Sequence, residues 1–161
     1  MTALENIKLD ELDLKVLCEV QLDSRISNNE LARRIHLSQP ATHARLKRLK
    51  SSGVIKSYTA VLDFEKTGFA LSCFLHIRLR AHLDKSLSRF EEGISLFPEI
   101  LECHYISGEF DYLLKAIFRN REDLTDFLRT KLSKLPDVIQ ISTSLVLSEI
   151  KSTTVLPFSE D

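Results

Sequence analysis

The sequence contains 161 residues, of which 43% are hydrophobic and 28% are charged, and its formal net charge is −1. This length suits one ordinary domain or two small ones, and the balance excludes a disordered chain. No apolar run approaches the roughly 18 residues of a membrane-spanning helix, and residues 1–15 carry acids without an apolar signal core. We therefore expect a cytoplasmic protein with no membrane partner.

Cysteine spacing and motifs argue against an enzyme. Cys18, Cys73 and Cys103 show no C-x-x-C spacing, so we expect reduced thiols and neither a disulfide framework nor a zinc site. The sequence contains no P-loop, no G-x-G-x-x-G and no H-E-x-x-H motif. We therefore predict no catalytic residue, no metal and no cofactor.

The first part of the chain has the pattern of three helices. Residues 10–22 place apolar side chains on one helical stripe and acids in the first turn. A second helix is predicted from Ser27, which forms a capping box with the glutamate three residues later. After a three-residue interruption, Ser38 and Pro40 begin a third helix, which ends at Gly53. A short helix, a tight turn and a helix with a small polar start indicate a helix-turn-helix domain.

The charge distribution favours DNA as the partner of the third helix. No acidic residue occurs between Glu30 and Asp63, whereas the same stretch contains seven basic residues, Arg33, Arg34, Arg45, Lys47, Arg48, Lys50 and Lys56. A carboxylate on this face would point at the phosphate backbone and weaken binding. We predict that polar groups early in the helix contact base edges and basic groups contact phosphates. The predicted DNA-binding residues are Ser38, Gln39, Thr42, His43, Arg45, Lys47 and Arg48.

Residues 54–62 form a β-branched, partly alternating ribbon, which we interpret as the wing of a winged helix-turn-helix. The alternative for the whole region is a three-helix protein-interaction domain whose basic face is only solvated.

The second half predicts the order β-α-β-β-α-β, which is the ferredoxin-like arrangement and makes the fold α+β. Residues 73, 75, 77 and 79 of the first strand form an apolar face, and His76 and Arg78 lie on the other. Gly108 and Glu109 join the two middle strands as a hairpin. Two helices cover one face of the sheet. A second copy of the chain is the simplest cover for the other face of the sheet, so we expect a two-fold dimer. Such a dimer presents two copies of the third helix to two DNA half-sites.

Three segments, LDELDLKVLCEVQLDSRISNNELARRIHLS, RLKRLKSSGVIKSYTAVLD and ECHYISGEFDYLLK, resemble the Lrp/AsnC family of feast/famine transcriptional regulators. SGEFDYLLK is the most specific part, and the resemblance extends from about Leu9 to Lys151. It implies a winged helix-turn-helix followed by a ferredoxin-like effector domain, dimers that assemble further, commonly into octamers, and a small amino acid as effector. We predict four regions: a winged helix-turn-helix DNA-binding domain (1–62), a linker (63–69), a ferredoxin-like effector-binding and oligomerisation domain (70–152) and a C-terminal tail (153–161).

The resemblance also implies an amino-acid pocket between dimers, around the hairpin turn. The matching positions are Ser107, Gly108, Glu109, Phe110, Asp111 and Tyr112, and weaker candidates on the last strand are Ser142, Thr143 and Ser144. Glycine lets a backbone N–H approach a carboxylate, and Asp111 can accept a hydrogen bond from an ammonium group. The alternative is that Gly108 only makes the turn and Asp111 only caps it.

One departure from the family lies in the turn before the third helix, where His36 replaces the usual glycine. If that position needs a positive φ, histidine is tolerated better than most residues, but the exact base contacts depend on the resulting turn angle.

These features together predict an amino-acid-responsive transcriptional regulator that binds operator double-stranded DNA as a dimer or higher oligomer, on the nucleoid. Two alternatives are an architectural DNA-binding protein without an effector and an enzyme resembling sirohaem decarboxylases. The enzyme would need histidines that converge on a tetrapyrrole, whereas the five histidines here are dispersed. The sequence leaves open which amino acid is the effector, which operator is bound and whether genes are activated or repressed.

Overall fold

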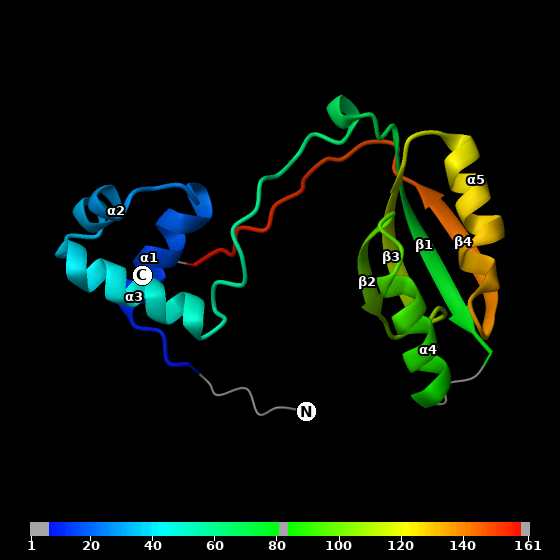
Figure 1. The fold of residues 1–161 in the computed structure, drawn as a ribbon, viewed down its shortest axis with the longest axis horizontal. Helices are drawn as coiled ribbons and strands as arrows, with labels where there is room; N and C mark the ends of the chain where they lie inside the picture. The colour runs from blue at the N-terminus through cyan, green and yellow to red at the C-terminus, as the bar shows by residue number, and fades with distance from the viewer. Residues whose placement is uncertain (1–6, 81–83, 159–161) are drawn as a thin grey trace. The chain divides into compact units, whose positions relative to one another are not determined.

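The computed structural model describes residues 7–80 and 84–158, which form two compact units (Figure 1). The first unit comprises residues 1–61 together with 152–161, and the second comprises residues 62–151. Each unit has its own hydrophobic core. Among the described helices, none is long and apolar enough to cross a membrane.

The first unit contains three helices, α1 (Glu11–Leu22), α2 (Asn28–Arg34) and α3 (Gln39–Ser51). Each begins at a side chain that accepts a hydrogen bond from a backbone N–H of the first turn, and these caps are Asp10, Ser27 and Ser38. The predicted helix-turn-helix is therefore confirmed.

The core of the first unit lies where the apolar faces of the three helices meet. Its buried members are Val16, Leu17, Val20, Leu31, Ile35 and Leu49. The C-terminal segment belongs to the same unit, because Phe158 packs against this core. In addition, the Leu156 N–H donates to Gln21 Oε1 at 2.7 Å, and Gln21 Nε2 donates to the Leu156 carbonyl at 3.4 Å. Residues of the C-terminal segment are thus held against α1.

The ribbon predicted over residues 54–62 does not pair as a strand, since no strand occurs between residues 54 and 70 of the described chain. Val54 and Ile55 instead pack against the helical core, and the Ile55 N–H donates to the Leu49 carbonyl at 3.0 Å. A ribbon needs a neighbouring strand that completes its ladder of hydrogen bonds. Alternation of side chains alone did not reveal whether that neighbour exists.

The second unit is a four-stranded antiparallel sheet with two helices, in the predicted β-α-β-β-α-β order. The strands are β1 (Leu71–Leu79), β2 (Ile100–Tyr105), β3 (Tyr112–Phe118) and β4 (Val138–Leu145). The helices are α4 (Asp84–Ser95), α5 (Arg121–Thr130) and the short 3-10 turns η1 (Glu65–Thr67) and η2 (Leu132–Lys134). The spatial order β2-β3-β1-β4 places the first and third strands at the centre, which confirms the ferredoxin-like fold.

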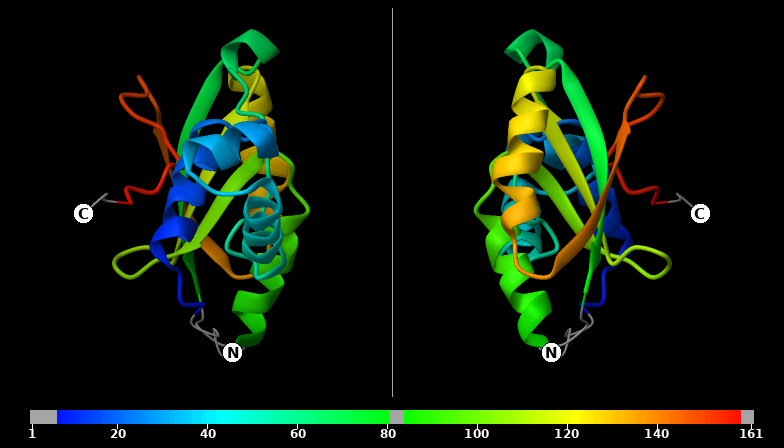
Figure 2. Two further views of the ribbon diagram at one scale, coloured as in Figure 1. Left: turned by 90° about the vertical axis from the view of Figure 1, so that its left-hand side faces the viewer. Right: turned by 90° about the vertical axis from the view of Figure 1, so that its right-hand side faces the viewer.

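One face of the sheet carries the core. Leu75 and Ile77 of β1 have no solvent exposure, and they belong to a cluster that includes Phe90 of α4 and Phe127 of α5. Both helices lie on the same side of the sheet (Figure 2). The alternate residues of β1, Phe74, His76 and Arg78, are half-buried on the opposite face. Neither α4 nor α5 packs on that face.

Candidate functional site

The start of α3 is set by the turn before it. His36 has a φ of 55°, so it occupies the left-handed region that histidine enters more readily than most residues. Ser38 then accepts from the Ala41 N–H at 3.4 Å, and Pro40 lies in the first turn, where a missing N–H leaves no bond unmade. The departure noted in the sequence is therefore accommodated by a positive φ.

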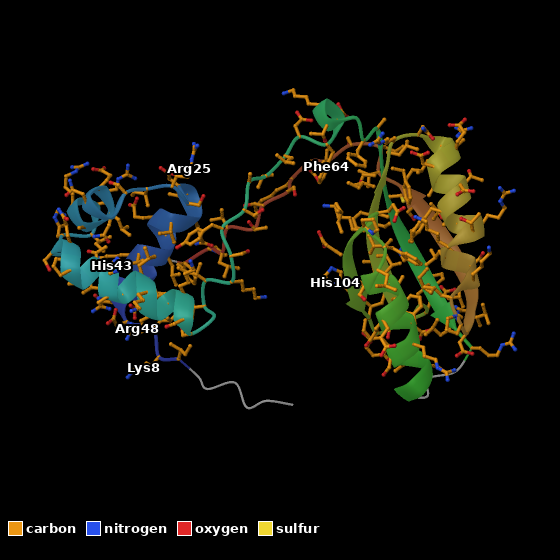
Figure 3. All side chains as sticks on the ribbon, in the orientation of Figure 1. Lys8, Arg25, His43, Arg48, Phe64 and His104 are labelled. Carbon is orange, nitrogen blue, oxygen red and sulfur yellow. The ribbon has the colours of Figure 1, made fainter. Side chains whose placement is uncertain are left out.

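One exposed stripe of α3 carries the groups suited to DNA. Gln39, His43, Lys47 and Lys50 follow each other at intervals of four, four and three residues, so they share one helical face, and all four are exposed. We call these residues the α3 stripe; Figure 3 labels His43 on it. Lys50 Nζ lies 5.8 Å from the centre of the Tyr58 ring, and neither lysine pairs with a carboxylate of the described chain.

Two predicted DNA-binding arginines instead face helix α1. Arg45 Nη1 lies 2.7 Å from Asp10 Oδ2 and 2.9 Å from Asp13 Oδ1, and Arg48 Nη2 contacts Asp13 Oδ2. Asp13 has no solvent exposure, and the Arg45 side chain is only 24% exposed. We call these four residues the arginine–aspartate cluster. They join α3 to α1 and leave little of Arg45 to reach a phosphate.

The acidic partners shift the titration of the cluster. The hydrogen bond from Arg45, followed by that from the Asp13 N–H, lowers the pKa of Asp10. The hydrogen bonds to Asp10 and Asp13 raise the pKa of Arg45. Both groups are therefore charged at neutral pH, and the pair persists across the physiological range.

Most of the acid-free basic stretch is neutralised in this way. Glu30, whose pKa is lowered to about 2 by hydrogen bonds from Arg33 and Arg34, pairs with both, and Glu19 pairs with Arg34. Together with the arginine–aspartate cluster, four of the seven basic residues thus have acidic partners from outside the stretch. The exposed positive charge is smaller than the sequence suggested.

Thr42 does not lie on the DNA-facing surface that the sequence analysis predicted. Its side chain has no solvent exposure, and its hydroxyl donates to the Ser38 carbonyl at 3.0 Å. It therefore stabilises the start of α3 from the inside.

A second candidate site is the loop between β2 and β3. Gly108 has a φ of 132°, which favours glycine. Arg78 Nε donates to the Glu109 carbonyl at 3.0 Å, and its Nη2 lies 2.9 Å from Glu109 Oε1. The Phe110 ring lies 5.3 Å from the His76 ring and 5.3 Å from the Arg78 guanidinium carbon. Arg78 thus holds the loop over the uncovered face of the sheet.

Asp111 has a structural partner. Its Oδ2 accepts from the Leu79 N–H at 2.7 Å, its own N–H donates to the Ile77 carbonyl at 2.8 Å, and its carbonyl accepts from the Ile106 N–H at 2.9 Å. The residue therefore ties the loop to the end of β1.

Tyr112 points into the core, where it is 1% exposed, and its hydroxyl donates to Glu91 Oε1 at 2.8 Å. Burial and this bond raise the pKa of Tyr112. Of the predicted loop residues, those that remain available to contact an effector are therefore residues 107–110.

The three candidates on β4 divide between the two faces of the sheet. Ser142 pairs with His76 and Ser144 with Phe74, so both lie on the uncovered face. Thr143 pairs with Leu75 and lies on the face that the helices cover. Only the two serines share a face with His76 and Arg78.

Comparison with known proteins decides the family. The family described as Lrp/AsnC ligand binding domain matches residues 72–156, which is more than half of the chain, and the family described as winged helix-turn-helix DNA-binding matches residues 9–56. The chain belongs to the Lrp/AsnC family. The earlier resemblance is thereby confirmed over both parts of the chain.

Named relatives of this Lrp/AsnC chain are regulators. It is 34% identical to the transcriptional regulator AzlB of Bacillus subtilis, over 96% of this chain and 98% of that one. It is 36% identical to a leucine-responsive regulatory protein of Haemophilus influenzae, over 94% of this chain and 91% of that one. A transcriptional regulator from Neisseria meningitidis, solved in complex with L-methionine, has a TM-score of 0.88 at 34% identity, covering 93% and 97% of the two chains. The chain is therefore a transcriptional regulator of the Lrp/AsnC type with a ligand-binding domain, and not an enzyme.

Sequence reasoning about this Lrp/AsnC chain missed three contributors to the candidate sites. Lys50 continues the α3 stripe, and its spacing of three from Lys47 was a usable signal. Arg78 was seen only as an outward residue of β1, and Asp13 only as an acid in a first turn. No local pattern shows the contacts that these two residues make with distant segments.

Proposed function

We propose that the protein binds operator DNA through the α3 stripe as a dimer or higher oligomer and responds to a small amino acid at the 107–110 loop. The observation that carries the proposal is the exposed stripe on α3, which combines a capped polar start with two lysines that have no acidic partner in the described chain. The names of the relatives, several of them leucine-responsive regulatory proteins, support the regulatory role.

The stripe divides into base-reading and phosphate-binding groups. Ser38 and Gln39 stand at the helix start, which enters the major groove first in helix-turn-helix proteins. Glutamine can form two hydrogen bonds with adenine, and His43 lies one turn further along the same face. Lys47 and Lys50 are suited to phosphates. Arg45 and Arg48 fit a role in holding the helix better than a role in direct contact.

The effector site rests on the loop and its neighbours. A backbone N–H at Gly108 can approach a carboxylate, while the Arg78 guanidinium, Ser142 and Ser144 offer further donors on the same face. The complex of the Neisseria relative with L-methionine supports an α-amino acid as ligand. Because the Asp111 carboxylate binds the Leu79 N–H, we assign the ammonium group to no single residue.

Assembly completes the proposal. The uncovered face of the sheet suits a second copy of the chain, and we propose that dimers join further, as far as octamers, with the effector between dimers. Residues 1–62 would carry DNA binding and residues 70–152 effector binding and assembly. We place the protein in the cytoplasm, on the nucleoid.

The first test selects binding sites from random duplex DNA and measures affinity at several salt concentrations. Lys47→Ala should weaken binding across sequences and flatten the salt dependence by about one unit of slope, because one phosphate contact is lost. The matched control is Ser51→Ala, an exposed change near the helix end. Unchanged affinity and slope in Lys47→Ala would move the DNA-contacting surface away from α3.

The effector test screens the twenty amino acids by thermal shift and repeats the DNA titration with those that bind. A true effector at about 100 times its Kd should stabilise the protein by about 2.7 kcal/mol. If DNA is bound but no amino acid changes either stability or affinity, the architectural alternative is favoured over the regulator.

A further inference from the structure

The arginine–aspartate cluster sets two acids beside the helix that we propose to enter the major groove. Asp10 contributes both carboxylate oxygens to Arg45 Nη1, at 2.8 and 2.7 Å. Asp13 contributes one oxygen to Arg45, at 2.9 Å, and the other to Arg48. Arg45 through Nη1 and Arg48 through Nη2 therefore already donate to carboxylates of the same chain.

The acids are themselves held in place. Asp10 Oδ1 accepts from the Asp13 N–H at 2.8 Å, and Asp13 Oδ2 accepts from the Asp10 N–H at 3.0 Å, which completes a capping box at the start of α1. Because each acid is part of the helix cap, neither can swing away without opening the first turn. The arginines are thus bound to fixed acceptors.

This arrangement opposes sequence-independent DNA binding. Each basic side chain that neutralises a phosphate releases counterions and contributes about 0.9 to the salt slope of the binding constant. An arginine that already neutralises a carboxylate must give up part of that charged interaction when it contacts a phosphate, so its net gain from the phosphate is reduced. A regulator must find few sites among roughly a million or more competing ones, and low non-specific affinity helps that search.

We propose that Asp10 and Asp13 act as intramolecular competitors of DNA phosphates for Arg45 and Arg48, and so hold down sequence-independent DNA affinity. This inference rests on the proposed DNA-binding function. It assigns α1 a part in DNA affinity although α1 contributes no base-reading residue.

The test is Asp10→Asn, measured with a labelled duplex of scrambled sequence at several salt concentrations. Asparagine caps a helix as well as aspartate does, and it keeps an oxygen for the Asp13 N–H, but it offers Arg45 no charged acceptor, so that Asp13 is the carboxylate left to Arg45. We expect non-specific affinity at low salt to rise by up to about tenfold and the salt slope to steepen by up to about 0.9, because Asp13 still binds Arg45 in this variant. A purely structural role for Asp10 would lower affinity or leave it unchanged.

Two controls show whether a change in the salt slope comes from the contact between Asp10 and Arg45. Glu11→Gln removes the same charge from the next residue, which is exposed and forms no ion pair in the described chain, so its slope should stay at the wild-type value. The double variant Asp10→Asn/Arg45→Gln should lose the gain in affinity, because the guanidinium that Asp10 no longer binds is gone. If Asp10→Asn lowers the unfolding midpoint below the assay temperature, Asp10→Ser, which also caps, repeats the measurement.

The outcomes separate this inference from the proposed function. The inference is overturned if the salt slope of Asp10→Asn equals that of Glu11→Gln. It is also overturned if the gain in non-specific affinity survives in the double variant. The proposed DNA binding stands in both cases. If neither the wild type nor any variant binds duplex DNA, the proposed function fails and the inference fails with it.

Discussion

The carboxylate of Asp13 shows how one residue limits what its neighbours can do. It has no solvent exposure, and it accepts from the Asp10 N–H and from two guanidinium groups. A buried acceptor that loses a donor keeps its desolvation penalty without compensation. Arg45, which the sequence suggested as a phosphate contact, is therefore first a structural partner of Asp13.

This reasoning predicts that Arg45→Ala destabilises the protein. The variant leaves Asp13 buried with one donor fewer, so the free energy of unfolding should fall by about 1–3 kcal/mol. Lys47→Ala, on the exposed stripe of the same helix, should change it by no more than about 0.5 kcal/mol. Urea denaturation followed by circular dichroism measures both. Equal stability in the two variants would show that the Arg45 contacts contribute nothing.

The acid stability of the first unit is a second prediction at this scale. Hydrogen bonds from Arg33 and Arg34 hold the pKa of Glu30 at about 2, below its ordinary 4.5. A carboxylate with a lowered folded-state pKa stabilises the fold fully above its unfolded value, and this contribution is lost as the pH falls through the folded value. The unfolding midpoint should therefore drop between about pH 5 and about pH 2. Glu30→Gln should show a shallower drop than Glu11→Gln, and identical profiles would contradict the assignment.

Single elements were predictable where local chemistry decides them. Ser27 and Ser38 were recognised as helix caps, and alternation along β1 separated its buried from its outward residues. On α3 the sequence placed Thr42 among the DNA-facing residues although it is buried, and it could not show which polar flank faces α1. That choice depends on Asp10, which lies 35 positions before Arg45. The prediction of a β-ribbon after α3 was wrong for the same reason, because the pairing of a strand depends on a second strand that can lie far away in the sequence.

The β2–β3 loop yields the prediction at the scale of elements. Asp111→Ala removes the acceptor of the Leu79 N–H, which lies 32 positions earlier, and should lower the free energy of unfolding by about 1–3 kcal/mol. Asp111→Asn keeps an oxygen in place and should retain most of that stability. Urea denaturation compares the two variants with the wild type. If the alanine variant is as stable as the asparagine variant, the bond to β1 does not hold the loop.

At the scale of the whole molecule, the two units differ in how fully their apolar surfaces are covered. The first unit includes the C-terminal segment, in which Leu156 contacts Gln21. No sequence pattern predicts this contact, since the two residues lie 135 positions apart. The second unit buries one sheet face under α4 and α5 and leaves Phe74, His76 and Arg78 on the other. A sheet face that carries an aromatic side chain and has no covering layer is typically closed by another subunit.

The last prediction follows from that uncovered face. The wild-type chain of 18.4 kDa should scatter light as a particle of at least twice that mass. Phe74→Asp places a charge in the middle of the face, where a partner would have to desolvate it, so the variant should dissociate to monomers at micromolar concentration. Ser88→Asp adds the same charge to an exposed position of α4 and should assemble as the wild type does. Light scattering after size exclusion separates the cases, and circular dichroism confirms that the Phe74 variant is folded. A folded Phe74→Asp protein that still assembles would place the subunit contact on another surface.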